Sequence, residues 1–215
     1  VKEDERAAVE WYRKSAEQGN SQGQFGLGQC YYLGNGVAEN DEAAVEWFLK
    51  AAEQGNSFAQ SNLGRCCLHG HGVEQNEPKA VEWFQQAAAA GNSQAECCLG
   101  DCYIGGTGVK EDERAAVEWY RKSAEQGDPE GQRNLAQCLQ SATGVEQDDR
   151  EAVEWFRKAA EQDDAEACLD LAQCYATGNG VQRDTATARE WAQKSTDNGN
   201  EYASEWLENY ERFAL

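Results

Sequence analysis

The sequence has no methionine, two prolines, two histidines and 19 basic residues against 39 acidic ones. It contains no run of the roughly 18 apolar residues that a membrane-spanning helix needs and no signal-peptide pattern, so we expect no membrane insertion. The net charge of −20 repels phosphate backbones and anionic lipids, which disfavours nucleic-acid and membrane-surface binding. Both histidines lie in one short segment, so the sequence offers few residues for an acid–base catalytic triad. We therefore expect no enzymatic activity.

A period of 36 residues runs through the whole chain. It is marked by a tryptophan column without insertion or deletion: Trp11, Trp47, Trp83, Trp119, Trp155 and Trp191. The segment Val1–Gly19 also recurs letter for letter at Val109–Gly127, three periods later. A period this strict is typical of one structural unit that is stacked repeatedly.

Each period predicts two helices. In the first full repeat, Asn20 is a good N-cap for a helix A over residues 21–33, and Gly34 is suited to end it. Asn40 opens a helix B that ends at Gly55. We expect about 29 of each 36 positions to be helical and no strand to form.

Helix B predicts where the core lies. Its apolar stripe at helical spacing consists of Ala44, Trp47, Phe48, Ala51 and Ala52. The tryptophan column is therefore interpreted as buried, worth about 4–6 kcal/mol per ring as an upper bound. On the outer face, Glu46 and Lys50 are spaced for an i, i+4 ion pair.

The repeat unit resembles a known family. A unit such as NSFAQSNLGRCCLHGHGVEQNEPKAVEWFQQAAAAG is similar to the Sel-one-like repeat, a relative of the tetratricopeptide repeat. The matching signature positions of this copy are Leu63, Gly64, Gly70, Gly72, Val73, Ala80 and Trp83. The resemblance covers the whole chain and implies an all-α, right-handed α–α superhelix, with A helices lining a concave face and B helices forming the convex back. It also implies a non-catalytic protein–protein interaction scaffold or adaptor, with no cofactor.

We expect one solenoid domain over residues 1–215. It divides into helix B of a truncated repeat over 1–19, a terminal capping helix over 200–215, and repeats over 20–55, 56–91, 92–127, 128–163 and 164–199. Because Val1 falls within a repeat and methionine is absent, the sequence is interpreted as a fragment of a longer protein. The first helix B has no helix A before it, so its uncovered apolar face is a candidate surface for self-association.

The nine cysteines are interpreted as reduced. Five of them form another 36-residue column on the buried side of helix A: Cys30, Cys66, Cys102, Cys138 and Cys174. Equivalent helices of neighbouring repeats are about 8–10 Å apart, which exceeds the roughly 7 Å limit between the Cα atoms of a disulfide. The column therefore predicts small packing residues, and the absence of a disulfide pattern favours a reducing intracellular compartment.

Two alternatives to a scaffold stay open. Cys66, Cys67, His69 and His71 fall within six residues and are possible zinc ligands, although they straddle the end of helix A, where successive side chains diverge. A metal- or redox-responsive module based on this cluster is one alternative. A regulatory domain of a larger enzyme is the other.

The binding surface is predicted by comparing the repeats with one another. In helix A, the positions equivalent to 22, 25, 26, 29, 32 and 33 vary, and their spacing places them on one helical face. We expect this face to form a concave groove for a peptide or protein segment, with Arg65 and Arg133 as anchors for a carboxylate of the partner. The predicted lining consists of Phe25, Gln29, Tyr32, Phe58, Asn62, Arg65, Leu68, Asp101, Ile104, Arg133, Asn134, Gln137, Leu169 and Gln173.

Overall fold

The structure, a computed structural model, describes residues 3–213, and these form twelve α-helices and no strand. The chain divides into two compact units, Val1–Glu111 and Asp112–Leu215. Unit 1 contains α1 (Glu3–Glu17), α2 (Ser21–Leu33), α3 (Asp41–Ala52), α4 (Ser57–His69), α5 (Glu77–Ala89) and α6 (Ser93–Gly105). Unit 2 contains α7 (Glu113–Glu125), α8 (Pro129–Ser141), α9 (Asp149–Glu161), α10 (Ala165–Thr177), α11 (Thr185–Asp197) and α12 (Glu201–Phe213).

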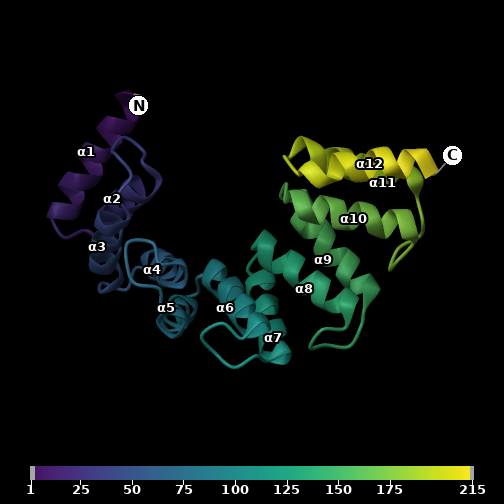
Figure 1. The fold of residues 1–215 in the computed structure, drawn as a ribbon, viewed down its shortest axis with the longest axis horizontal. Helices are drawn as coiled ribbons and strands as arrows, with labels where there is room; N and C mark the ends of the chain where they lie inside the picture. The colour runs from purple at the N-terminus through teal and green to yellow at the C-terminus, as the bar shows by residue number, and fades with distance from the viewer. Residues whose placement is uncertain (1–2, 214–215) are drawn as a thin grey trace. The chain divides into compact units, whose positions relative to one another are not determined.

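Within each unit the helices stack in chain order. The even-numbered helices are the A helices and the odd-numbered ones are the B helices (Figure 1). In unit 1, α3 packs against both α2 and α4, and in unit 2, α9 packs against both α8 and α10. The prediction of an all-α repeat fold is confirmed.

The predicted caps determine the ends of the helices. The Asn20 side chain accepts a hydrogen bond from the Gly23 backbone N–H, and Gly34 ends α2 in the left-handed conformation with φ 67°. Helix α2 therefore covers the predicted range. Helix α3 is shorter than predicted, because the Gln54 N–H bonds to the Ala51 carbonyl three residues back and tightens the last turn.

The glycine loop after each A helix lies directly on the preceding repeat. A Cβ atom on Gly72 would overlap the backbone carbonyl of Asp41, the first residue of α3, and Gly144 stands in the same relation to Glu113. Only glycine permits this approach of two backbones. The second glycine of the loop therefore fixes the spacing between successive B helices within a unit.

In the repeats of Trp47, Trp83 and Trp155, the core contains the residue after the tryptophan rather than the tryptophan itself. Phe48, Phe84 and Phe156 are fully buried, whereas Trp47 and Trp83 are only half-buried. The prediction of a buried tryptophan column is therefore wrong in its degree of burial. The neighbouring position on the same stripe faces the A helices directly.

At Trp47, Trp119 and Trp155 the exposed side of the ring is covered by a lysine. The Nζ atom of Lys50 lies 3.9 Å from the centroid of the Trp47 ring, and the equivalent distances are 3.8 Å at Trp119 and 3.6 Å at Trp155. Within residues 3–213, Lys50 makes no ion pair with Glu46, so the predicted i, i+4 pair is wrong. The ammonium group instead lies over the ring, where it is attracted to the π face while its alkyl stem covers apolar surface.

A glutamine pair joins helix A to the end of helix B within one repeat at two places. The amide of Gln24 donates to the Ala16 carbonyl, and its Oε1 accepts from Gln54 Nε2 at 2.7 Å. In unit 2, Gln132 and Gln162 make the same contact at 2.9 Å.

The repeat over residues 56–91 lacks the second glutamine. Gln60 donates to the Ala52 carbonyl, but its buried Oε1 has no hydrogen-bond partner. The residue equivalent to Gln54 and Gln162 is here Ala90. A buried acceptor without a partner destabilises the folded state.

We predict that Phe84→Ala lowers the free energy of unfolding by about 3–5 kcal/mol, because it leaves a cavity in a fully buried site. Trp83→Ala should cost less, because part of that ring already faces solvent. Equilibrium unfolding in urea measures both. An equal or larger loss for Trp83→Ala would contradict the assignment of the core to the phenylalanine position.

We also predict that Ala90→Gln stabilises the protein by about 1 kcal/mol, because the new amide reaches the unpaired Oε1 of Gln60. Thermal or urea unfolding measures the gain. Ala89→Gln, one residue earlier at an equally exposed position, is the matched control and should change stability little. No gain for Ala90→Gln over Ala89→Gln would show that the acceptor is satisfied in another way.

Candidate interaction surface

All fourteen predicted lining residues lie on A helices, nine in unit 1 and five in unit 2. None of them is buried, and Phe58 is 55% exposed. The core-facing positions of the same helices, such as Leu63 and Cys66, are almost completely buried. The division of each A helix into a packing face and a variable face is therefore as predicted. The groove that these faces would form stays a prediction.

The variable faces of α2 and α4 meet through aromatic side chains. The ring centroids of Phe25 and Phe58 are 5.9 Å apart, and Phe25 also lies 6.0 Å from the core residue Phe48. The hydroxyl of Tyr32 is 3.2 Å from Nδ1 of His71, in the loop after α4. These contacts place apolar and aromatic groups of two successive repeats on one surface. We call this surface of Phe25, Tyr32, Phe58, Arg65 and His71 the aromatic face.

Two members of this region were not predicted as lining residues. His71 was considered only as a metal ligand, although it bonds to Tyr32. Leu33, which is 58% exposed at the end of α2, belongs to a variable position of the repeat and could have been included on that ground.

Arg65 differs from Arg133 in its partners. Within residues 3–213, Arg65 makes no ion pair. Arg133 in unit 2 pairs with Glu166 at 2.6 Å and with Asp164 at 3.6 Å. The guanidinium of Arg133 is thus paired within the chain, and its role as an anchor for a partner stays a prediction.

The amides on the variable face are also partly engaged. Nδ2 of Asn62 donates to the Phe58 carbonyl one turn earlier at 2.8 Å, and Gln137 donates to Asp170 at 3.0 Å. These donors are used within the chain. The apolar side chains and Arg65 are what the face of unit 1 offers to a partner.

The cysteine–histidine cluster of the second repeat does not converge. Cys66 and Cys67 are buried, whereas His69 and His71 are exposed. In the part of the chain that the structure describes, these four residues do not bring three potential ligand atoms within 4.8 Å of one another. Burial also raises the pKa of Cys66 to about 12, which disfavours the thiolate that a metal would bind.

The cysteine column is packed into the core as predicted. Burial raises the pKa of Cys102, Cys138 and Cys174 to about 11, and it also raises the pKa of Cys30. A folded-state pKa above the unfolded value means that the neutral thiol is favoured by folding. This contribution to stability is present below about pH 9 and is lost as the pH rises toward 11.

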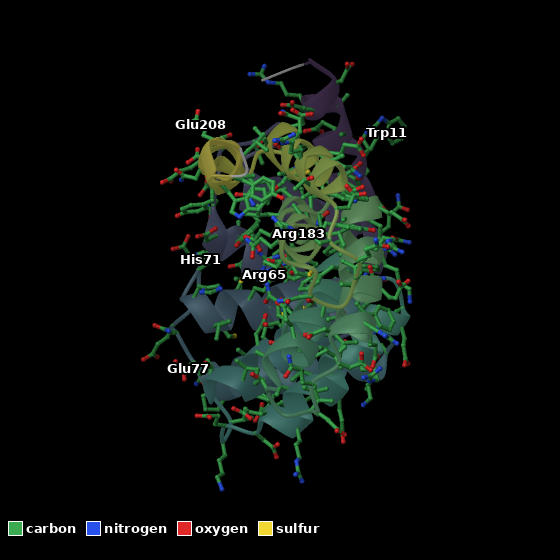
Figure 2. All side chains as sticks on the ribbon, turned by 90° about the vertical axis from the view of Figure 1, so that its right-hand side faces the viewer. Trp11, Arg65, His71, Glu77, Arg183 and Glu208 are labelled. Carbon is green, nitrogen blue, oxygen red and sulfur yellow. The ribbon has the colours of Figure 1, made fainter. Side chains whose placement is uncertain are left out.

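The two end helices differ in what they expose. On α1, Trp11 is 71% and Tyr12 is 42% exposed, whereas Tyr120, at the same position of the identical segment, is 4% exposed. Figure 2 shows Trp11 projecting from its helix. On α12, the exposed Glu208 occupies the position equivalent to Gly28 of α2. In α2 and α4 a phenylalanine ring of the next helix packs against this position, whereas the last A helix has a polar residue there. This fits a capping helix, while self-association through α1 stays a prediction.

Six Sel1 repeats match the chain, over residues 1–20, 21–56, 57–92, 93–128, 129–164 and 165–200. The chain belongs to the Sel1 repeat family. Among solved structures, a Sel1 repeat protein from Oxalobacter formigenes is 34% identical, with a TM-score of 0.83 over 88% of this chain and 76% of that protein. No curated protein matches the chain significantly.

Two further structures are similar. The protein c5321 of uropathogenic Escherichia coli, described as a protective antigen with an SLR fold, is 36% identical, with a TM-score of 0.79. The Sel1 chain described here matches it over 94% of its own length but only 43% of c5321. A Sel1 repeat protein from Klebsiella pneumoniae, at 19% identity and a TM-score of 0.63, supports the fold alone.

Sel1 repeat proteins are generally protein–protein interaction scaffolds and typically have no enzymatic activity. Among residues 3–213, no helix has the length and apolar character to cross a membrane.

We predict that Cys98 is the fastest thiol to react in the native protein near neutral pH, because it is half-buried and the other eight cysteines are buried. Labelling with a maleimide followed by peptide mass mapping measures the order of reaction. Cys98→Ser should remove the fast phase, and nine thiols should react after denaturation without reductant. Equally fast labelling of Cys66 or Cys102 would contradict their burial.

Proposed function

We propose that this Sel1 repeat chain is a non-catalytic scaffold that binds a peptide or protein segment on the variable face of its A helices. The observation that carries the proposal is the contact between the exposed Phe58 and Phe25 on successive A helices. Single exposed apolar residues are normal on a protein surface. Large side chains that touch one another across two repeats form a continuous apolar surface, which is typical of a binding site.

The opposite side of each unit supports this choice of face. The exposed positions of α3 and α5 are mostly charged or amide residues, and the Trp47 ring is covered by Lys50. Such a surface is well solvated without a partner. A partner bound to the face of the A helices would therefore remove more apolar surface from water than one bound to the B-helix side.

The alternative of a metal- or redox-responsive module is less well supported. It would need Cys66 and Cys67 to reach the exposed imidazoles of His69 and His71, and both thiols are packed in the core. A regulatory role beside an enzymatic domain is compatible with a scaffold, since it too depends on binding a protein segment.

We predict that Phe58→Ala combined with Asn62→Ala weakens binding at least tenfold without changing thermal stability, because Phe58 is 55% exposed and Asn62 stands one turn later on the same face of α4. The probe is a peptide selected on the wild-type protein from a phage-displayed library of random 12-residue peptides. Fluorescence anisotropy measures its affinity.

The matched control is Lys79→Ala combined with Glu82→Ala, two exposed residues on α5 of the same unit. This pair is preferred to Glu118 and Lys122, because Lys122 lies over Trp119 and contributes to packing. If only the control pair weakens binding, the binding face is the B-helix side. If the library yields no binding peptide, the proposed function is wrong.

A further inference from the structure

The charge of this protein is unevenly distributed over its helices. Of the twelve helices within residues 3–213, α2 and α4 are the only two that contain no aspartate or glutamate. The whole chain has 39 acidic residues, and α6, α8, α10 and α12 each contain at least one. The two A helices that carry the aromatic face are thus the ones without carboxylates.

The one strong cation of this face is Arg65, in the middle of α4. It is half-buried and, within the described residues, makes no ion pair. It lies close enough to Tyr32 to act on the titration of its hydroxyl. Burial raises the pKa of Tyr32 and Cys66 raises it further, while Arg65 lowers it by more than either Asp41 or Glu39 raises it. The guanidinium of Arg65 therefore lies close to the hydroxyl of Tyr32, one of the aromatic side chains of this face.

We propose that the aromatic face of unit 1 binds a peptide segment in which a large apolar side chain stands next to a carboxylate, with the apolar group on Phe25 and Phe58 and the carboxylate on Arg65. This inference rests on the proposed function and names its site and the chemistry of its partner. A guanidinium without a partner beside an apolar surface recognises a carboxylate through paired hydrogen bonds, and that bond is strengthened where apolar groups exclude water.

The net charge of −20 does not prevent such binding. At physiological ionic strength the Debye length is about 8 Å, so exposed carboxylates on distant loops and helices are largely screened. A direct contact with Arg65 is screened much less. Helices α2 and α4 contribute no carboxylate to this surface, and the nearby carboxylates of Glu39 and Asp41 belong to the loop after α2 and to α3.

Unit 2 does not offer the same site. Its A-helix arginine, Arg133, is held by Glu166 and Asp164, and Gln137 is bonded to Asp170. The residue equivalent to Arg65 is the neutral Gln137. A carboxylate would therefore meet neutralised or acidic groups there, and we assign the site to unit 1 alone.

The test uses the same library of random 12-residue peptides, selected on the whole chain. We expect the selected peptides that depend on Phe58 to combine Phe, Trp, Tyr or Leu with a neighbouring Asp or Glu. For one such peptide, replacing the acidic residue by its amide should weaken binding to the wild-type protein about tenfold. On Arg65→Gln the same replacement should have almost no effect, because the group that recognises the charge is gone.

Arg114→Gln, at an exposed arginine on α7, is the matched control and should retain the tenfold preference. Circular dichroism of each variant checks that the fold is kept. Selected peptides that require Phe58 but are neutral or basic, or an acid preference that survives Arg65→Gln, would overturn this inference and leave the proposed function intact. Peptides that bind independently of Phe58 and Asn62 would overturn both.

Discussion

The contact on which unit 1 depends is that of an aromatic ring of a B helix with a position on the preceding A helix that has no side chain. Phe48 lies against Gly28 and Phe84 against Gly64, where even one added carbon would overlap the ring. Because interiors are close-packed, this contact fixes the separation and rotation of the two helices. It thereby determines which side of each A helix stays outside. The exposure of Phe58 is a consequence of the way in which Gly64 and Phe84 lock α4 to α5.

The sequence was most informative where structure depends on local interactions. Asn20 and Gly34 cap α2 through bonds to their own neighbours, so the boundaries of that helix could be predicted from spacing alone. The choice between Trp47 and Phe48 could not, because adjacent residues on one apolar stripe differ by about 100° around the helix and both suit burial. Which one faces the core depends on the neighbouring helices. The engagement of Arg133 with Glu166, 33 residues later, likewise depends on side-chain directions that a repeat pattern does not contain.

The same repeat carries different side chains on the A helices of the two units. In unit 2 the polar side chains of the A helices pair with one another, as Gln137 does with Asp170, and the surface is satisfied by its own groups. In unit 1, α2 and α4 instead carry the rings of Phe25, Tyr32 and Phe58 together with Arg65. Contact of these rings with another molecule would remove apolar surface from water. The scaffold is common to both, since the packing positions hardly change. Function is therefore encoded in the residues that the fold leaves outside, and each unit can change them without cost to the core.

The identical segments Val1–Gly19 and Val109–Gly127 have a consequence for how the chain folds. Helices α1 and α7 each meet an A helix with glycine at the same contact: Gly23 leaves room for Ser15, and Gly131 leaves room for Ser123. This serine–glycine contact is the same at both interfaces, so the contact alone does not encode which copy belongs to which A helix. Chain connectivity favours the native pairing, because each copy is tied to its own A helix by a very short turn and closing a short loop costs less entropy than closing a long one. Without that turn, the two A helices would be distinguished only by their other contacts, such as that of Tyr12 with Gly26, whose equivalent in α8 is Asn134.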